Sequence, residues 1–159
     1  MTPNIGITGK NQAAVVAILN AVLADEYVLY TKTRNYHWNV VGPQFNDLHK
    51  FFEAQYEALD DIVDDVAERT RSLGGNALGT LAEFTRQTRL KEKVGEYPGA
   101  DAMLADLLAD HETLIRQLRA DLDVAMDKHH DAGTSDFLTG LMEKHEKMAW
   151  MLRAFQAGS

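Results

Sequence analysis

Apolar residues recur at steps of three and four along four long stretches of the chain, and this helical period is the dominant pattern in the sequence. In the first stretch the apolar positions run from Val15 through Leu19 to Leu29, and Glu26 stands where an apolar residue is expected. No stretch alternates with the period of two that is typical of strands. The pattern predicts an all-α fold with long helices over about residues 11–38, 45–73, 99–129 and 134–156.

Turn-forming residues separate the predicted helices. Gly42-Pro43 and Gly74-Gly75 end the first two, and the segment 133–136 supplies a stop and then a cap for the fourth. The link over about residues 74–98 is long, and a short helix from Leu78 to Phe84 fits within it. Short, long and short connections are those of a ferritin-like four-helix bundle with one crossover. We therefore expect a single domain over residues 1–159, with residues 1–10 as a short N-terminal tail.

Composition narrows the range of functions. The chain has 16 Lys and Arg against 24 Asp and Glu, a net charge of −8, which disfavours a dedicated nucleic-acid binder and suits a protein that handles cations. It has no cysteine, which excludes disulfide frameworks and thiolate metal sites. The early apolar run from Ala13 to Leu19 is too short to span a membrane, and no basic segment precedes it. These features predict a cytoplasmic protein without membrane association.

Histidines and carboxylates gather on the first two predicted helices in a pattern typical of a metal site. His49 and Glu53 form one pair four residues apart, and Asp64 and Glu68 form another, so each pair projects from one helix face. His37 precedes the tight turn at Gly42, which brings it near His49. Imidazole and carboxylate together suit divalent ions such as Fe(II), and also zinc or manganese. Any one of these carboxylates, taken alone, is equally explained as part of a solvated helix face.

The spacing decides how these residues can meet. Asp64 follows His49 by fifteen residues, which is about 22 Å along a helix, whereas a metal–ligand bond is about 2 Å long. One chain therefore cannot bring both pairs to one ion. Two copies with antiparallel second helices about a two-fold axis can do so, and each dimer then has two sites. A di-iron site within one bundle uses two Glu-x-x-His pairs, which this sequence lacks; the nearest pattern is Asp127–His130.

Around these residues the sequence resembles the Dps family, the ferritin-like "DNA-binding proteins from starved cells", also called mini-ferritins. The stretch from His37 to Glu53 is similar to the family's first signature, and the stretch from Val63 to Ala77 is similar to its second. The helical plan extends the resemblance over nearly the whole chain.

The resemblance implies a shell of twelve subunits that oxidises Fe(II), preferably with hydrogen peroxide, and stores a ferric mineral. It implies that His37 and His49 of one subunit and Asp64 and Glu68 of its neighbour bind iron across a two-fold interface. Glu53 falls where the family has an acidic ligand, and Trp38 matches the aromatic residue beside the site. The acidic pair Asp131 and Asp136 resembles the lining of the family's iron-uptake pore, although both are equally explained as capping and turn residues.

Three functions stay open on sequence grounds: an iron-oxidising storage cage, a nucleoid DNA-binding protein with an incidental metal site, and a helical oligomer that binds a divalent ion without turnover. Residues 1–10 carry Lys10 as their only basic residue, and residues 155–159 carry none, which argues against a DNA-binding tail. His111 and His145 lie on apolar stripes and are predicted to be hydrogen-bonded core residues rather than metal ligands.

Overall fold

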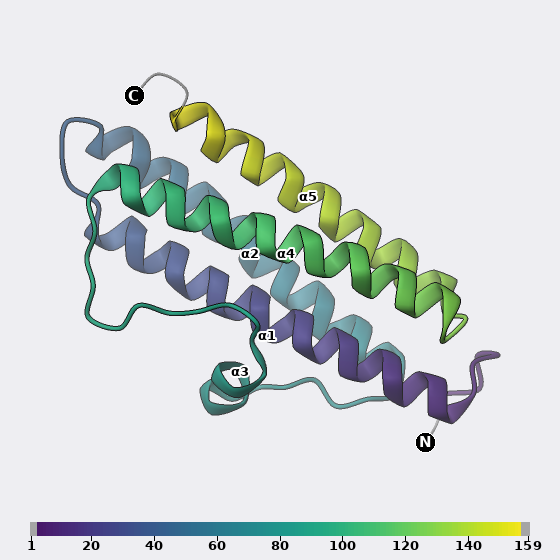
Figure 1. Ribbon diagram of the computed structural model, residues 1–159. Helices are drawn as coiled ribbons and strands as arrows, with labels where there is room; N and C mark the ends of the chain where they lie inside the picture. The colour runs from purple at the N-terminus through teal and green to yellow at the C-terminus, as the bar shows by residue number, and fades with distance from the viewer. Residues whose placement is uncertain (1–2, 157–159) are drawn as a thin grey trace.

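The structure, a computed structural model, describes residues 3–156, and the regular elements of this part of the chain are all helical (Figure 1). Four long helices form the bundle and a short fifth lies outside it: α1 (Gly9–Asn39), α2 (Phe45–Ser72), α3 (Leu81–Gln87), α4 (Ala100–Asp127) and α5 (Ala132–Gln156). Each long helix begins and ends within two residues of its predicted bounds. The all-α ferritin-like plan is confirmed.

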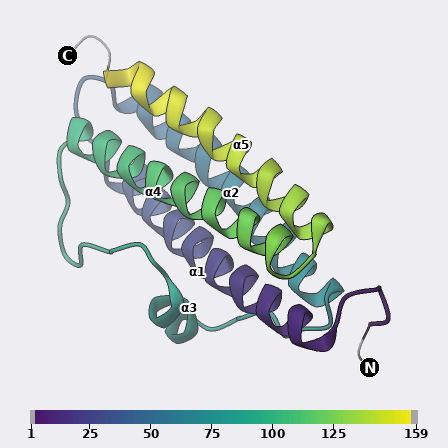
Figure 2. The same ribbon diagram turned by 45° about the vertical axis from the view of Figure 1, so that its right-hand side comes forward.

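The four long helices pack as two hairpins lying side by side. α1 packs closely against α2, and α4 against α5. The crossover from α2 to α4 runs along the outside of α1, and α3 lies against α1, as both ribbon views show (Figures 1 and 2). This arrangement leaves the turn between α1 and α2 at one end of the bundle and the turn between α4 and α5 at the other.

The short helix lies three residues further along the chain than predicted: it begins at Leu81 instead of Leu78. The reason is a capping box at Thr80, whose hydroxyl accepts from the amide of Glu83 while the Glu83 carboxylate accepts from the amide of Thr80. The backbone N–H of Leu78 donates to the Asn20 side chain on α1, which holds this residue in the linker.

The cap of α5 also differs from the predicted one. The helix begins at Ala132, and Asp131 caps it by accepting from the amide of Thr134 at 2.9 Å and from the Thr134 hydroxyl at 2.7 Å. Arg69 of α2 holds the same carboxylate at 3.3 Å. Asp136, which the sequence offered as a cap, lies inside the helix and is exposed.

The core of the bundle contains one buried polar cluster among its apolar side chains. Glu26, His111 and His145 come from α1, α4 and α5 and are fully buried. The Nδ1 atoms of the two imidazoles lie 2.9 Å apart and share a proton, and His145 Nε2 lies 2.8 Å from Glu26 Oε1. The prediction of hydrogen-bonded core histidines is confirmed, and the same contacts explain why Glu26 interrupts the apolar stripe of α1.

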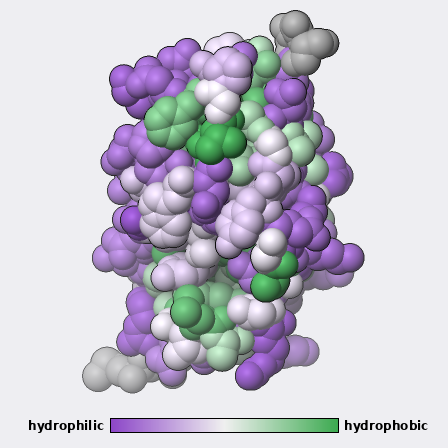
Figure 3. All heavy atoms as spheres, turned by 90° about the vertical axis from the view of Figure 1, so that its left-hand side faces the viewer, coloured by the Kyte–Doolittle hydropathy of each residue, from purple (hydrophilic) through white to green (hydrophobic). Residues whose placement is uncertain are grey.

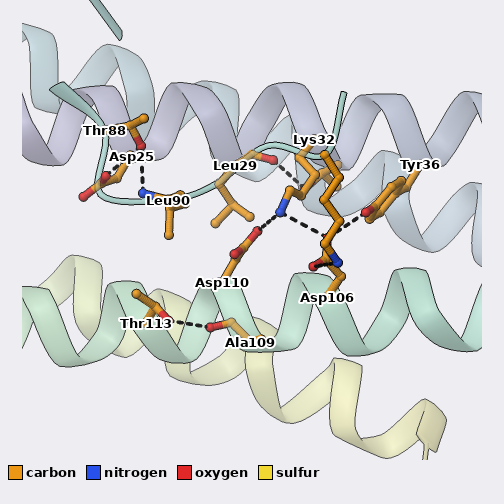
Figure 4. A network of polar contacts seen from close by, with 12 residues as sticks. Asp25, Leu29, Lys32, Tyr36, Thr88, Leu90, Asp106, Ala109, Asp110 and Thr113 are labelled. Carbon is orange, nitrogen blue, oxygen red and sulfur yellow. Dashed lines mark hydrogen bonds and ion pairs between the residues drawn. The ribbon is translucent and has the colours of Figure 1, made fainter. Parts of the chain in front are cut away.

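Buried ion pairs hold the crossover and α4 against α1 (Figure 4). Lys32 lies between Asp106 at 3.1 Å and Asp110 at 2.5 Å, and the Tyr36 hydroxyl donates to Asp106 at 2.6 Å. The pKa of Tyr36 is raised by its burial and by the neighbouring carboxylate of Asp106. A second contact joins Arg89 of the crossover to the buried Asp25 at 2.7 Å.

α1 as a whole is long and apolar enough to span a membrane, judged by length and composition alone. The apolar run from Ala13 to Leu19 within it is too short to do so. Half of its most apolar window is buried inside the bundle, because α1 packs against α2, α3 and α4. The apolar character of α1 is therefore accounted for by its place in the core.

Candidate metal centre

The turn between α1 and α2 brings His37 and His49 into direct contact. Gly42 adopts a φ of +119°, which is costly for other residues, and its carbonyl accepts from the amide of Phe45 to close the turn at 3.0 Å. The two imidazole rings stack with their centroids 3.8 Å apart. The sequence-based prediction that these two residues meet is confirmed.

Hydrogen bonds fix the orientation of both rings and place a proton on Nδ1 of each. His37 Nδ1 lies 2.8 Å from the carbonyl oxygen of His49, and His49 Nδ1 lies 2.9 Å from the carbonyl oxygen of His37. A carbonyl oxygen only accepts hydrogen bonds, so each Nδ1 carries the proton and donates. In the neutral imidazole this leaves the lone pair on Nε2, which is the form of histidine that binds a metal. The turn therefore presents two oriented nitrogen ligands.

Glu53 lies one helical turn beyond His49 and is half-buried. The hydroxyl of Tyr56 is 3.5 Å from Glu53 Oε1, and the Tyr56 ring meets the edge of the His37 ring with the centroids 5.2 Å apart. The sequence does not indicate that Tyr56 belongs to the site, because its contact with His37 depends on how α1 and α2 pack. Its spacing of three residues from Glu53 is the only local clue.

Arg34 is a second residue of the site that the sequence did not single out. Its guanidinium lies over three aromatic rings, 4.9 Å from the centroid of Tyr56, 5.2 Å from that of Trp38 and 5.5 Å from that of Tyr30. Trp38 follows His37 in the sequence and is 64% exposed. The hydrogen bond from Arg34 to Tyr30 raises the pKa of the guanidinium, which stays charged.

Asp64 and Glu68 lie far from the histidines in the same chain. α2 runs unbroken from Phe45 to Ser72, so the separation of about 22 Å expected from helical rise is preserved. Both carboxylates are exposed. Within residues 3–156 no group of three or more His, Asp or Glu side chains is placed to hold a metal ion. The structure thus brings together His37 and His49, with Glu53 on the same face of α2, and holds Asp64 and Glu68 apart from them.

The end of the bundle that bears the α1–α2 turn exposes apolar side chains in small patches between polar ones (Figure 3). The exposed large apolar residues at this turn are Trp38, Val41 and Phe45. The Phe45 ring also lies 5.1 Å from the ring of His49.

Comparison with known proteins identifies the class to which this chain belongs. The family model described as "Ferritin-like domain" matches residues 16–157, so the chain is a ferritin-like protein. It is 50% identical over 155 residues to an uncharacterized low temperature-induced protein of Nostoc sp., covering 98% of this chain and 87% of that one. It is 38% identical over 142 residues to DNA protection during starvation protein 2 of Bacillus anthracis, covering 89% and 95%.

A solved structure, that of a Dps protein from Bacillus brevis, has a TM-score of 0.88 and 35% identity, covering 94% of this chain and 99% of that one. Within the ferritin-like class, the chain belongs to the Dps family.

Proposed function

We propose that this protein is an iron-oxidising and iron-storing mini-ferritin. It takes Fe(II) and hydrogen peroxide as substrates, forms Fe(III) at sites shared between two subunits, stores the ferric product inside a hollow shell and so limits oxidative damage. The observation that carries the proposal is the reciprocal pair of hydrogen bonds between His37 and His49, because it leaves both Nε2 atoms free to bind a metal.

The shared site consists of His37, His49 and Glu53 from one subunit and Asp64 and Glu68 from its neighbour. The unbroken α2 supports this division, because it keeps the two halves of the ligand set apart in one chain. A two-fold axis relates such halves twice, so each dimer carries two sites. Six such dimers make the twelve-subunit shell that the family resemblance implies.

Two ferrous ions in one site match the chemistry of peroxide. Two Fe(II) ions supply the two electrons that reduce one hydrogen peroxide, with two protons, to two waters, and no hydroxyl radical is released. The histidines hold the ions through Nε2, while the half-buried carboxylate of Glu53 neutralises part of their charge. Zinc and manganese bind the same ligand types and are therefore expected to compete with iron.

Iron reaches the cavity through a pore lined by Asp136, with Asp131 in the adjoining turn. Asp136 is exposed and has its side chain available. The oxygens of Asp131 are engaged by Thr134 and Arg69, so its part in the pore is to hold the turn in place.

DNA compaction is not part of the proposal. The net charge of −8 opposes binding to phosphates. The start of the chain is also tied down in its described part: the Gln12 side chain donates to the Pro3 carbonyl at 3.0 Å. Pro3 lies so close to Gly74 that a β-carbon there would come within 2.5 Å of its ring.

The proposal is tested by loading the protein with Fe(II) without oxygen, adding hydrogen peroxide and following ferric absorbance together with the mass of the assembly. We expect rapid oxidation of many irons by a large soluble shell. His37→Ala and Asp64→Ala should each slow it to near the protein-free rate, whereas His129→Ala, in the α4–α5 turn, should not. Oxidation in the parent protein no faster than in buffer would contradict the proposal.

A further inference from the structure

Three tyrosine rings form a continuous row that leads away from His37 along α1. The ring of Tyr56 lies against His37 with a centroid distance of 5.2 Å. Tyr30 follows at 6.2 Å from Tyr56, and Tyr27 at 5.8 Å from Tyr30. Tyr27 ends the row by stacking on Phe84 of α3 at 4.3 Å. Because electron transfer weakens steeply with distance, rings in contact let a single electron move in short steps.

The guanidinium of Arg34 lies close to some of these rings and not to others. Its guanidinium lies over Tyr56, Tyr30 and Trp38, and its Nη1 also donates to the Tyr30 hydroxyl at 2.5 Å. Among the described residues no arginine or lysine lies over the ring of Tyr27. A nearby cation disfavours loss of an electron from a ring, since the ring becomes more positive. Of these four side chains, Tyr27 is therefore the one that a nearby cation does not protect from oxidation.

We propose that Tyr56, Tyr30 and Tyr27 carry one-electron oxidising equivalents away from the metal ligands, and that the resulting radical rests on Tyr27 rather than on Trp38. This inference depends on the proposed function, because the oxidant is hydroxyl radical formed where a single Fe(II) in a half-filled site meets hydrogen peroxide. The three tyrosines hold no metal, and two of them, Tyr30 and Tyr27, lie seven and ten positions before His37.

The transfer conserves electrons and protons. One Fe(II) and one hydrogen peroxide give Fe(III), hydroxide and a hydroxyl radical, which takes one electron and one proton from its surroundings and becomes water. Tyr56 supplies both the electron and its phenolic proton, and it regains a proton from water when it is reduced again. Tyr30 refills Tyr56, and Tyr27 refills Tyr30. Tyr27 is half-buried, so its phenolic proton passes to water, and it ends as a neutral phenoxyl radical.

The test is freeze-quench electron paramagnetic resonance on the assembled protein. It is loaded anaerobically with less than one Fe(II) per site and then mixed with hydrogen peroxide, and ferric absorbance is read on the same samples. Ring-deuterated tyrosine distinguishes a tyrosyl signal from a tryptophanyl one. We expect a tyrosyl signal in the parent protein, loss of most of it in Tyr27→Phe, and a gain on Trp38. Tyr97→Phe, which removes a tyrosine outside the row that is 69% exposed, should leave the signal unchanged.

An undiminished tyrosyl signal in Tyr27→Phe, or a parent radical located on Trp38, would overturn the relay. Normal ferric absorbance without any tyrosyl signal would overturn the relay and leave the proposed function standing. Absence of ferric absorbance in the parent protein would overturn both. Phenylalanine keeps the stacking on Phe84, so a change of signal in Tyr27→Phe does not come from lost packing.

Discussion

The buried imidazole of His111 should make the stability of the fold depend on pH. Burial and the neighbouring His145 hold its pKa well below the ordinary value of 6.5. In the unfolded chain the same imidazole takes up a proton near pH 6.5, so below that pH the unfolded state binds more protons than the folded one. The free energy of unfolding therefore falls as the pH falls below about 6.5, by up to about 1.4 kcal/mol per pH unit for this one group.

Urea unfolding at pH 7.5, 6.5 and 5.5, at one protein concentration, measures this contribution. His111→Gln keeps a hydrogen-bonding partner for His145 but does not titrate, so its unfolding free energy should fall less with acidification than that of the parent protein. His129→Gln removes a half-buried histidine in the α4–α5 turn and should keep the parent slope. Equal slopes in all three proteins would show that His111 does not control the acid response.

Single residues also show where sequence reasoning succeeds and where it stops. Glu26, His111 and His145 were visible as polar residues on apolar stripes, but their mutual contacts depend on the packing of three helices. Arg34 and Tyr56 were not predicted as site residues for the same reason: their contact joins α1 to α2 and depends on how these helices pack. The contact between His37 and His49 was predicted correctly because a short turn joins the two helices that carry them.

At the scale of the element, a buried charge cluster joins α1 to α4. Lys32 is 6% exposed and lies between two carboxylates that are 14% exposed. Lys32→Met leaves Asp106 and Asp110 without their buried partner, and we expect a loss of about 3 kcal/mol in unfolding free energy. Arg119→Met breaks an exposed pair with Glu146 and should cost under about 1 kcal/mol. Urea unfolding compares the two variants, and similar losses would contradict a special role for Lys32.

The elements also show why helix ends are harder to predict than helices. The long helices follow from their apolar period, which many residues support. The start of α5 was harder to predict, because the sequence offered Asp136 as the cap and Asp131 as a turn residue. In the structure Asp131 is the cap, and Arg69 of α2 contacts its carboxylate. The start of α3 depends on Thr80 and Glu83, a capping box that is readable in the sequence but lies inside a linker of little periodicity.

At the scale of the whole molecule, we propose that half of the candidate site comes from another subunit, and the spacing along α2 is the sequence feature that indicates this. Mixing two inactive chains tests it. His49→Ala retains an intact Asp64 and Glu68 half, and Asp64→Ala retains an intact histidine half. In a mixed dimer one site joins both intact halves and the other joins both altered ones. Equal mixing after dissociation should therefore restore about a quarter of the parent ferroxidase activity, since half of the dimers are mixed and each has one good site.

The matched control mixes His49→Ala with His37→Ala. Both changes fall in the same half, so no pairing of these chains joins two intact halves and activity should stay at the level of either variant alone. Native mass spectrometry on both mixtures verifies that mixed dimers form. With exchange verified, no recovery in the first mixture, or equal recovery in both, would rule out a site divided between His37, His49 and Glu53 of one subunit and Asp64 and Glu68 of the other.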